Sequence, residues 1–267
     1  MPVRLVRSPG CGGHAQALAE ALLADGQVIE DQDTDPDGVQ LHCGPEGLSL
    51  VTPAPRPLEL RIDFTRGRQA YRLARAGHAR EDLLRALGTL PAGSRILDAS
   101  AGLGRDALVL AARGFRVLAF ERHPVLAALL EDALHRAQAS ASLRPILDRI
   151  DLRAEDVRTA LGDLEPVAEA AIFDPMFPAR AKDAAVKKEM QILQQLIGAD
   201  PDPDAPETLA ALRRHVRRRV VVKRPLYAPP VGDETPAHAL RGRSIRFDVY
   251  LPLPGSGESA AASPRAR

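Results

Sequence analysis

The chain contains no tryptophan, and aromatic residues make up only 3% of its 267 residues. Its core must therefore be built from aliphatic side chains, and with 45% hydrophobic residues the chain is long enough to form one large core. No apolar run approaches the roughly 20 residues that span a bilayer, so we predict no membrane-spanning helix. The first residues, MPVRLVRSPG, lack the apolar segment of a secretory signal peptide, and we expect a cytoplasmic protein.

Cysteine is also scarce, with only Cys11 and Cys43. Two cysteines agree with a reducing compartment and predict no disulfide framework. Together with His14 and His42 they could be drawn as a zinc site, but His42 and Cys43 are neighbours, and neighbours in a strand point to opposite faces. We predict no metal. No nucleophile elbow, Walker loop or HExxH motif occurs, so hydrolase and kinase functions have no support.

Positive charge is unevenly distributed although the net charge is only +1. Residues 61–80 carry six arginines and one acid, and residues 213–224 carry seven basic residues and no acid. Such segments can hold a polyanion, because phosphate attraction is local, or they can be solvated helix faces. Lysine is confined to four positions in a chain that otherwise uses arginine.

From residue 94 onward, apolar strands alternate with amphipathic helices. This alternation predicts an α/β fold of the Rossmann-like type, a mainly parallel sheet with helices on both faces. The stretch IRFDVYLP is expected to form an antiparallel edge strand. We expect a small N-terminal annex of short strands (1–66), the main domain (67–254) with a helix over 67–87, and a disordered tail (255–267).

The stretch ILDASAGLG places Gly102 and Gly104 between a predicted strand and a predicted helix. Glycine lets the backbone turn tightly and approach a ligand, and the helix N-terminus attracts negative charge. The next strand ends in Glu121, which can accept both hydroxyls of a ribose. A dinucleotide cofactor would also suit this pattern. Asp98 lies four residues before Gly102, however, and can bind an amino-acid ammonium group, which a nicotinamide cofactor lacks.

The stretch AAIFDPMFP predicts a buried strand that ends in Asp174 and a stiff turn. Carboxyl ends of parallel strands meet at one edge, so Asp174 should face the same crevice as Gly102. Asp174 and the Pro175 carbonyl can accept hydrogen bonds from an exocyclic amine, and the base can stack on Phe177. We therefore predict Asp174, Pro175 and Phe177 as catalytic residues.

Four motifs carry a family resemblance, and they occur in order: ILDASAGLGRDALVLA, ERHPVLAALL, DPMFP with VKKEM, and VVVKRPLYAPP. Over residues 60–250 the chain resembles the ribosomal RNA small subunit methyltransferase J family. The glycine loop is similar to the first motif of class I S-adenosylmethionine methyltransferases. The resemblance implies methylation of the 2-amino group of a guanosine near the 3′ end of 16S rRNA, with S-adenosylmethionine as cofactor and the rRNA or small subunit as partner. It implies these cofactor-binding residues: Asp98, Gly102, Gly104, Arg105, Asp106, Glu121, Arg122, Glu155, Asp156 and Asp174.

The lysines then acquire a predicted task, together with one arginine. We expect the following residues to bind RNA phosphates around the target base: Lys182, Lys187, Lys188, Lys223 and Arg224. Solvated charge is the alternative explanation. Other functions stay open at this point: an amino-methyltransferase acting on DNA adenine or a protein amide, a nucleotide-dependent oxidoreductase, or a non-catalytic RNA-binding factor.

Overall fold

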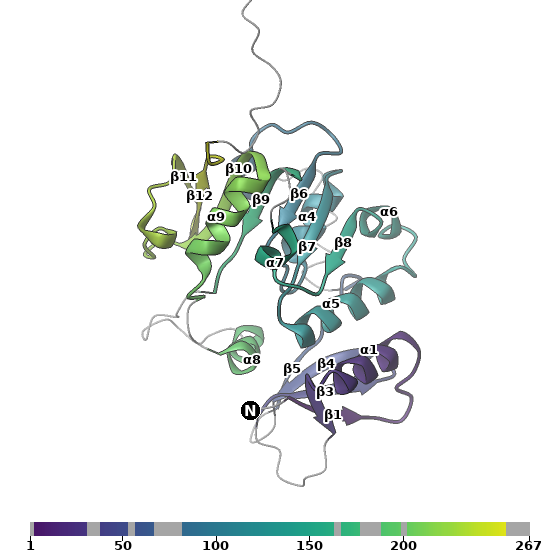
Figure 1. Ribbon diagram of the computed structural model, residues 1–267. Coiled ribbons are helices and arrows are strands. Elements are labelled where there is room, and N and C mark those ends of the chain that lie inside the picture. Colours follow the sequence, from purple (N-terminus) through teal and green to yellow (C-terminus); the bar gives the residue numbers. More distant parts are fainter. Residues whose placement is uncertain are drawn as a thin grey trace, which may run out of the picture.

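The computed structural model describes residues 3–30, 38–52, 57–66, 82–162, 167–176, 188–198 and 202–254, which form two sheets and their helices (Figure 1). The N-terminal annex contains β1 (Val3–Arg7), α1 (Gly13–Ala24), β2 (Val28–Glu30), β3 (Gln40–Gly44), β4 (Gly47–Thr52) and β5 (Leu58–Leu60). The larger domain contains α3 (Asp82–Leu87), β6 (Arg95–Asp98), α4 (Arg105–Ala112), β7 (Arg116–Phe120), α5 (Pro124–Ala137), α6 (Arg144–Leu147), β8 (Ile150–Arg153), α7 (Val157–Leu161), β9 (Ala168–Phe173), α8 (Lys188–Ile197), α9 (Ala205–His215), β10 (Val216–Pro225), the 3-10 turn η1 (Val231–Asp233), β11 (His238–Arg241) and β12 (Ile245–Tyr250).

The larger sheet has the strand order β11-β12-β10-β9-β6-β7-β8. Strands β10, β9, β6, β7 and β8 run parallel, whereas β12 and β11 are antiparallel, so the predicted α/β class is confirmed. The prediction of β12 as the edge strand is wrong, because β11 pairs outside it. Helices α1 and α9 are additional elements that the sequence pattern did not indicate to us.

Local sequence signals explain where several elements begin and end. Pro124 occupies the first turn of α5, where its fixed backbone angle favours a helix and no amide hydrogen is needed. Gly88 adopts a left-handed conformation after α3 and donates its N–H to the carbonyls of Leu84 and Arg85, which ends the helix. Strand β9 is almost wholly buried, as expected for a strand that is covered on both faces.

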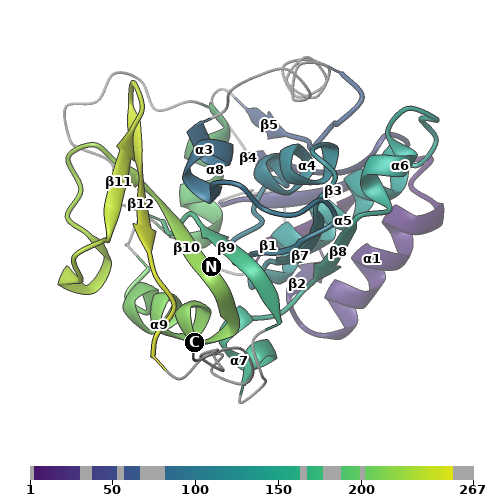
Figure 2. The ribbon, with the colours of Figure 1, turned by 90° about the horizontal axis from the view of Figure 1, so that it is seen from above.

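Helices cover both faces of the larger sheet, as Figure 2 shows from above. Helices α7 and α9 lie on one face, over a core that includes Leu209, Val220 and Val222. Helices α3, α4 and α5 lie on the other face, over a core that includes Leu108 and Leu129. The sheet therefore separates two hydrophobic clusters and exposes its carboxyl edge between the two helix layers.

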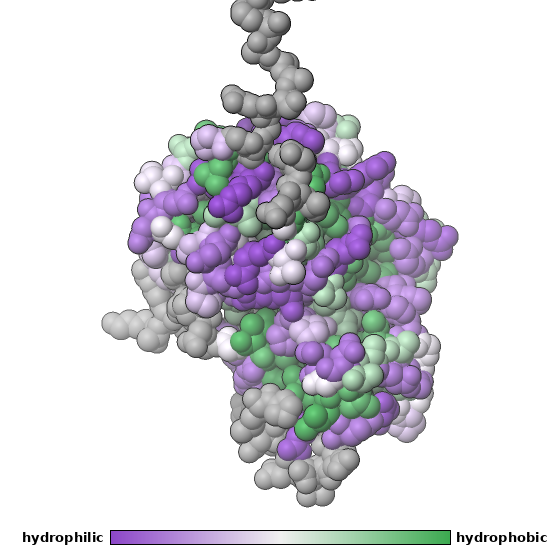
Figure 3. Space-filling model, in the orientation of Figure 1, coloured by the Kyte–Doolittle hydropathy of each residue, from purple (hydrophilic) through white to green (hydrophobic). Residues whose placement is uncertain are grey.

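The annex sheet, ordered β2-β1-β3-β4-β5, shares the second of these clusters. Helix α5 packs against α1 and β4, and α8 packs against β5. The buried Asp132 on α5 accepts a hydrogen bond from the Leu48 amide at 3.0 Å and pairs with Arg136. On the face in Figure 3, hydrophilic side chains cover most of the larger domain, while apolar side chains gather in smaller patches on the annex. The annex thus belongs to one continuous core with the larger domain.

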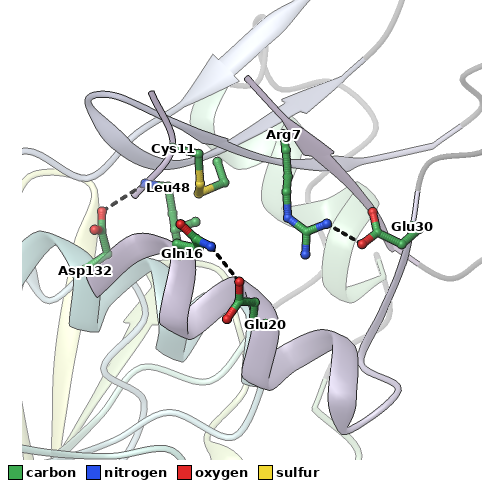
Figure 4. The surroundings of a disulfide bond; sticks show 8 residues. Arg7, Cys11, Gln16, Glu20, Glu30, Leu48 and Asp132 are labelled. Carbon is green, nitrogen blue, oxygen red and sulfur yellow. Dashed lines mark hydrogen bonds and ion pairs between the residues drawn. A yellow bond between two sulfur atoms is a disulfide. The ribbon is translucent and has the colours of Figure 1, made fainter. Parts of the chain in front are cut away.

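The two cysteines contradict the prediction that the chain has no disulfide. Cys11 and Cys43 form a disulfide bond with their Cα atoms 5.4 Å apart, joining the loop after β1 to β3 (Figure 4). Because Cys43 lies within a buried strand that pairs with β1, this loop comes close enough to bond with it. Among the described residues, no helix combines the length and apolarity needed to cross a bilayer.

Candidate active site

The carboxyl edge of the larger sheet opens into a cavity of about 1310 Å³. Twelve of the predicted site residues line it: Asp98, Gly102, Arg105, Asp106, Glu121, Arg122, Glu155, Asp156, Asp174, Pro175, Lys223 and Arg224. Gly104 lies behind the lining, and Lys188 is exposed on α8. Phe177, Lys182 and Lys187 lie outside the described residues. The topology therefore gathers residues from the carboxyl ends of five strands, β6 to β10, in one place.

The glycine loop between β6 and α4 is fixed by close packing. Gly102 and Gly104 both have positive φ, at 53° and 68°. A methyl group on Gly104 would lie 2.6 Å from Leu130 Cδ1 and 3.1 Å from Phe64 Cζ, so only glycine fits. Phe64 follows the annex sheet, which means that the annex supports this loop directly. A methyl group on Gly102 would instead meet open space, apart from one carbonyl 3.8 Å away.

Glu121, at the end of β7, anchors the other side of the loop. One carboxylate oxygen accepts the Gly102 amide at 2.8 Å, and the other accepts the His123 amide at 2.9 Å. Burial raises the pKa of Glu121, while these two hydrogen bonds oppose the rise. Each oxygen keeps further acceptor capacity towards the cavity, as the binding of two adjacent hydroxyl groups requires.

Asp98 ends β6 and is almost completely buried. Burial, reinforced by the nearby charge of Asp106, raises the pKa of Asp98 to about 8. Asp98 Oδ1 accepts a hydrogen bond from the Ser100 amide at 3.3 Å. A buried carboxyl group with an elevated pKa in a cavity wall is suited to receive a cationic ligand group, whose charge would favour the ionised form.

The turn after β9 is held by polar contacts on both sides. The Asp174 amide donates to Ser100 Oγ at 2.8 Å, which ties this turn to the glycine loop. The Met176 amide donates to Asp202 Oδ2 at 2.8 Å. The Asp174 side chain remains 53% exposed and faces the cavity. Its carboxylate is thus fixed at the backbone but accessible to a ligand.

Lys223, one of the predicted RNA-binding residues, makes contacts within the cavity that the sequence did not indicate. It lies on β10, and its ammonium group forms ion pairs with Asp106 and, at 3.1 Å, with Asp174. Burial alone would lower the pKa of Lys223, but Asp174 and Asp106 outweigh it and raise the pKa. Although the Asp174 side chain is 53% exposed, it lies within the cavity, whose walls limit its hydration and so raise its pKa, while Lys223 opposes that rise. The lysine therefore neutralises cavity carboxylates in the structure.

Arg224 lies at the predicted edge of the sheet, but its side chain is buried in the loop that follows β10. It is only 5% exposed, and its guanidinium donates two hydrogen bonds to the Pro229 carbonyl, at 3.0 and 2.7 Å. The Pro229 carbonyl, five residues along the chain, thus takes the guanidinium into the loop. Lys188 remains exposed, as expected.

A network of arginines and acids closes one wall of the cavity. Arg122 pairs with Asp202 and with both oxygens of Asp204, and Arg158 joins Asp204 to Asp156. Asp202 and Asp204 were not among the predicted site residues. The acidic string before α9 was the available signal, but only the tertiary fold brings it to the turn after β9.

These features fit an S-adenosylmethionine molecule. Asp98 would receive the ammonium of its amino-acid part, Glu121 its ribose hydroxyls, and Gly102 would allow close approach of the backbone. Asp156, which caps α7 by accepting the Arg158 amide at 2.8 Å, and the neighbouring Glu155 line the far end, where the adenine would lie. Among the residues that the structure describes, no three His, Cys, Asp or Glu side chains cluster in a way that could hold a metal ion.

Comparisons with known proteins agree with this geometry. Residues 22–252 match the SAM_MT family model of SAM-dependent methyltransferases. The chain is 43% identical over 238 residues to a ribosomal RNA small subunit methyltransferase J of Thioalkalivibrio sulfidiphilus, covering 87% of this chain and 92% of the relative. It is 42% identical over 238 residues to the protein of the same name from Dechloromonas aromatica, covering 88% and 96%.

A solved structure supports the fold independently. The crystal structure of a SAM-dependent methyltransferase from Neisseria gonorrhoeae matches with a TM-score of 0.73 and 26% identity, covering 95% of this chain and 97% of that one. The agreement extends over both the annex and the larger domain. The chain belongs to the ribosomal RNA small subunit methyltransferase J family of S-adenosylmethionine-dependent methyltransferases.

Proposed function

We propose that this protein methylates the exocyclic 2-amino group of a guanosine near the 3′ end of 16S rRNA in the small ribosomal subunit. The observation that carries the proposal is the Asp174–Pro175 turn, which faces the same cavity as Asp98 and Glu121. The relatives at 42–43% identity bear names that specify small-subunit ribosomal RNA. If the protein acts on ribosomal RNA, it acts in the cytoplasm.

Asp174 supplies the chemistry that an aromatic amine needs. The bound cofactor provides a methyl group on a sulfonium, which is already a good electrophile. Asp174 and the Pro175 carbonyl would accept hydrogen bonds from the amine and direct its nitrogen lone pair at that methyl carbon. The nitrogen–carbon bond forms as the carbon–sulfur bond breaks, and the electron pair stays on sulfur. The surplus proton leaves the nitrogen through Asp174, whose raised pKa favours its acceptance.

The test uses small subunits that lack the modification and methyl-labelled S-adenosylmethionine. We expect the label in 2-methylguanosine after digestion of the rRNA. Asp174→Asn keeps the shape but removes the charge, and should lower the rate about 100- to 1000-fold with cofactor binding retained. Label in another nucleoside, or unchanged activity of Asp174→Asn, would contradict the proposal.

A further inference from the structure

The loop that follows β10 presents two apolar side chains to solvent. Leu226 is 37% exposed and Tyr227 is 38% exposed, although large hydrophobic residues in the described part of the chain are mostly buried. Both belong to the motif VVVKRPLYAPP, and the methyl-transfer chemistry gives them no task. Both follow directly on Pro225, which lines the substrate cavity, so these two exposed side chains lie close to it.

Two buried arginines hold this loop in a defined shape. Arg224 donates to the Pro229 carbonyl at the far side of the loop. Arg246, 8% exposed on β12, donates to the carbonyls of Pro225 and Leu226 at 3.0 and 3.1 Å, while Asp248 binds its remaining nitrogens at 2.8 and 2.9 Å. Burying guanidinium groups is unfavourable unless they are fully paired. The guanidinium groups of Arg224 and Arg246 fix the loop, while Leu226 and Tyr227 at its tip stay exposed. The tip is therefore pre-organised for binding.

The β11–β12 hairpin adds positive charge beside the same loop. Pro225 on β10 pairs with Ile245, and Arg241 pairs with Arg246 across the hairpin, so the hairpin turn projects next to Leu226. Arg241 and Arg243 are exposed, and residues 235–247 contain no acid. The turn residues Gly242, Arg243, Ser244 and Ile245 line the same cavity as Asp174. Apolar and cationic groups thus meet at one side of the cavity mouth.

We propose that this surface, the stacking rim (Leu226, Tyr227, Arg241, Arg243 and Ile245), receives the unpaired RNA strand next to the target guanosine. Tyr227 stacks on a base that neighbours the target, and Arg241 and Arg243 bind phosphates. An aromatic face combined with arginines suits a single strand, because every base has a stacking face and phosphates pair with guanidinium groups. The inference rests on the proposed function and names a binding surface for the RNA next to the target base.

Binding of RNA tests the rim separately from methylation. The probes are unmodified 16S rRNA and a short fluorescent oligoadenylate, measured over a series of salt concentrations. Tyr227→Ala should weaken binding of both about tenfold or more, because stacking is lost, whereas Tyr227→Phe should bind as the wild type does. The Arg241→Ala, Arg243→Ala double variant should reduce the slope of log affinity against log salt by about two.

Two controls keep the result interpretable. Arg116→Ala removes an exposed arginine at the opposite, amino edge of the sheet, and should leave RNA affinity and salt slope unchanged. Affinity for S-adenosylhomocysteine should be unchanged in every variant, which shows that the site is folded. Unchanged RNA binding by Tyr227→Ala would overturn the stacking rim even if 2-methylguanosine is formed. Conversely, weakened binding with label in a different nucleoside would support the rim and refute the proposed target.

Discussion

The glycine loop and the Asp174–Met176 turn are joined by a hydrogen bond from the Asp174 amide to Ser100 Oγ. The two segments are nevertheless stabilised in different ways. The glycine loop is fixed by shape, because Gly104 fits between Leu130 and Phe64 with no room for a methyl group. The turn is fixed by charge and hydrogen bonding, through Asp202 and Lys223.

This difference separates two requirements of methyl transfer. A cofactor of constant shape can be bound by a rigid wall, and close packing gives one well-defined geometry. In the proposed reaction, the amine of the target base needs a hydrogen-bond and proton acceptor with a suitable charge and pKa. Interacting ionisable groups on the turn side of the cavity can provide such an acceptor. Changes on the loop side should therefore act on stability and cofactor binding, whereas changes on the turn side should act on the rate of methylation and on the pH dependence of that rate.

The largest expected effect is that of Gly104→Ala. The new methyl group meets Leu130 and Phe64, and the positive φ is unfavourable for alanine. Overpacking and backbone strain together should lower the free energy of unfolding by about 2–5 kcal/mol and abolish S-adenosylhomocysteine binding. The matched control is Gly93→Ala, which has φ 75° but open space around it and should lose only about 1 kcal/mol. If urea denaturation gave equal losses of unfolding free energy for the two variants, close packing around Gly104 would not be what fixes the glycine loop.

Lys223→Met should come next, with an effect on rate. It leaves Asp106 and Asp174 without their shared cation, so the pKa of Asp174 should rise and the methylation profile should move to higher pH. We expect kcat at pH 7 to fall about 100-fold with little change in S-adenosylhomocysteine affinity. Lys223→Arg should restore part of the rate and of the original pH profile. A rate loss without any shift in the pH profile would make Lys223 merely structural.

The smallest expected effect concerns Asp98 and cofactor binding. Its pKa of about 8 means that the free site holds a proton at pH 6.5, and a cationic ligand must displace it. Affinity for S-adenosylhomocysteine should therefore rise with pH, about tenfold between pH 6.5 and 8, because each pKa unit corresponds to a factor of ten. Calorimetry should also detect proton release. Asp98→Asn should bind more weakly and lose most of this dependence.

The regular part of the fold was predictable because its signals are local. The alternation of strands and helices after residue 94, Pro124 at the start of α5 and Gly88 after α3 are each written in a few adjacent residues. The cavity was largely predictable as well, since parallel strands bring Asp98, Glu121 and Asp174 to one edge.

What the sequence did not reveal depends on contacts between distant residues. The burial of Lys223 follows from its position in a central strand facing Asp106, 117 residues away. The roles of Asp202 and the Cys11–Cys43 bond likewise depend on tertiary proximity. Charge density along the chain indicated a polyanion partner, but it did not distinguish arginines that hold a loop from arginines that face solvent.

The shared core of the annex and the larger domain has a consequence for synthesis of the chain. Strands β1–β5 leave the ribosome before α5 and α8, against which the annex packs and which are translated about 60 to 130 residues later. Until those helices emerge, only α1 packs against the annex strands, on β2 and β3. The annex thus completes its native packing only after later segments have been made, and annex and larger domain should unfold as one cooperative unit.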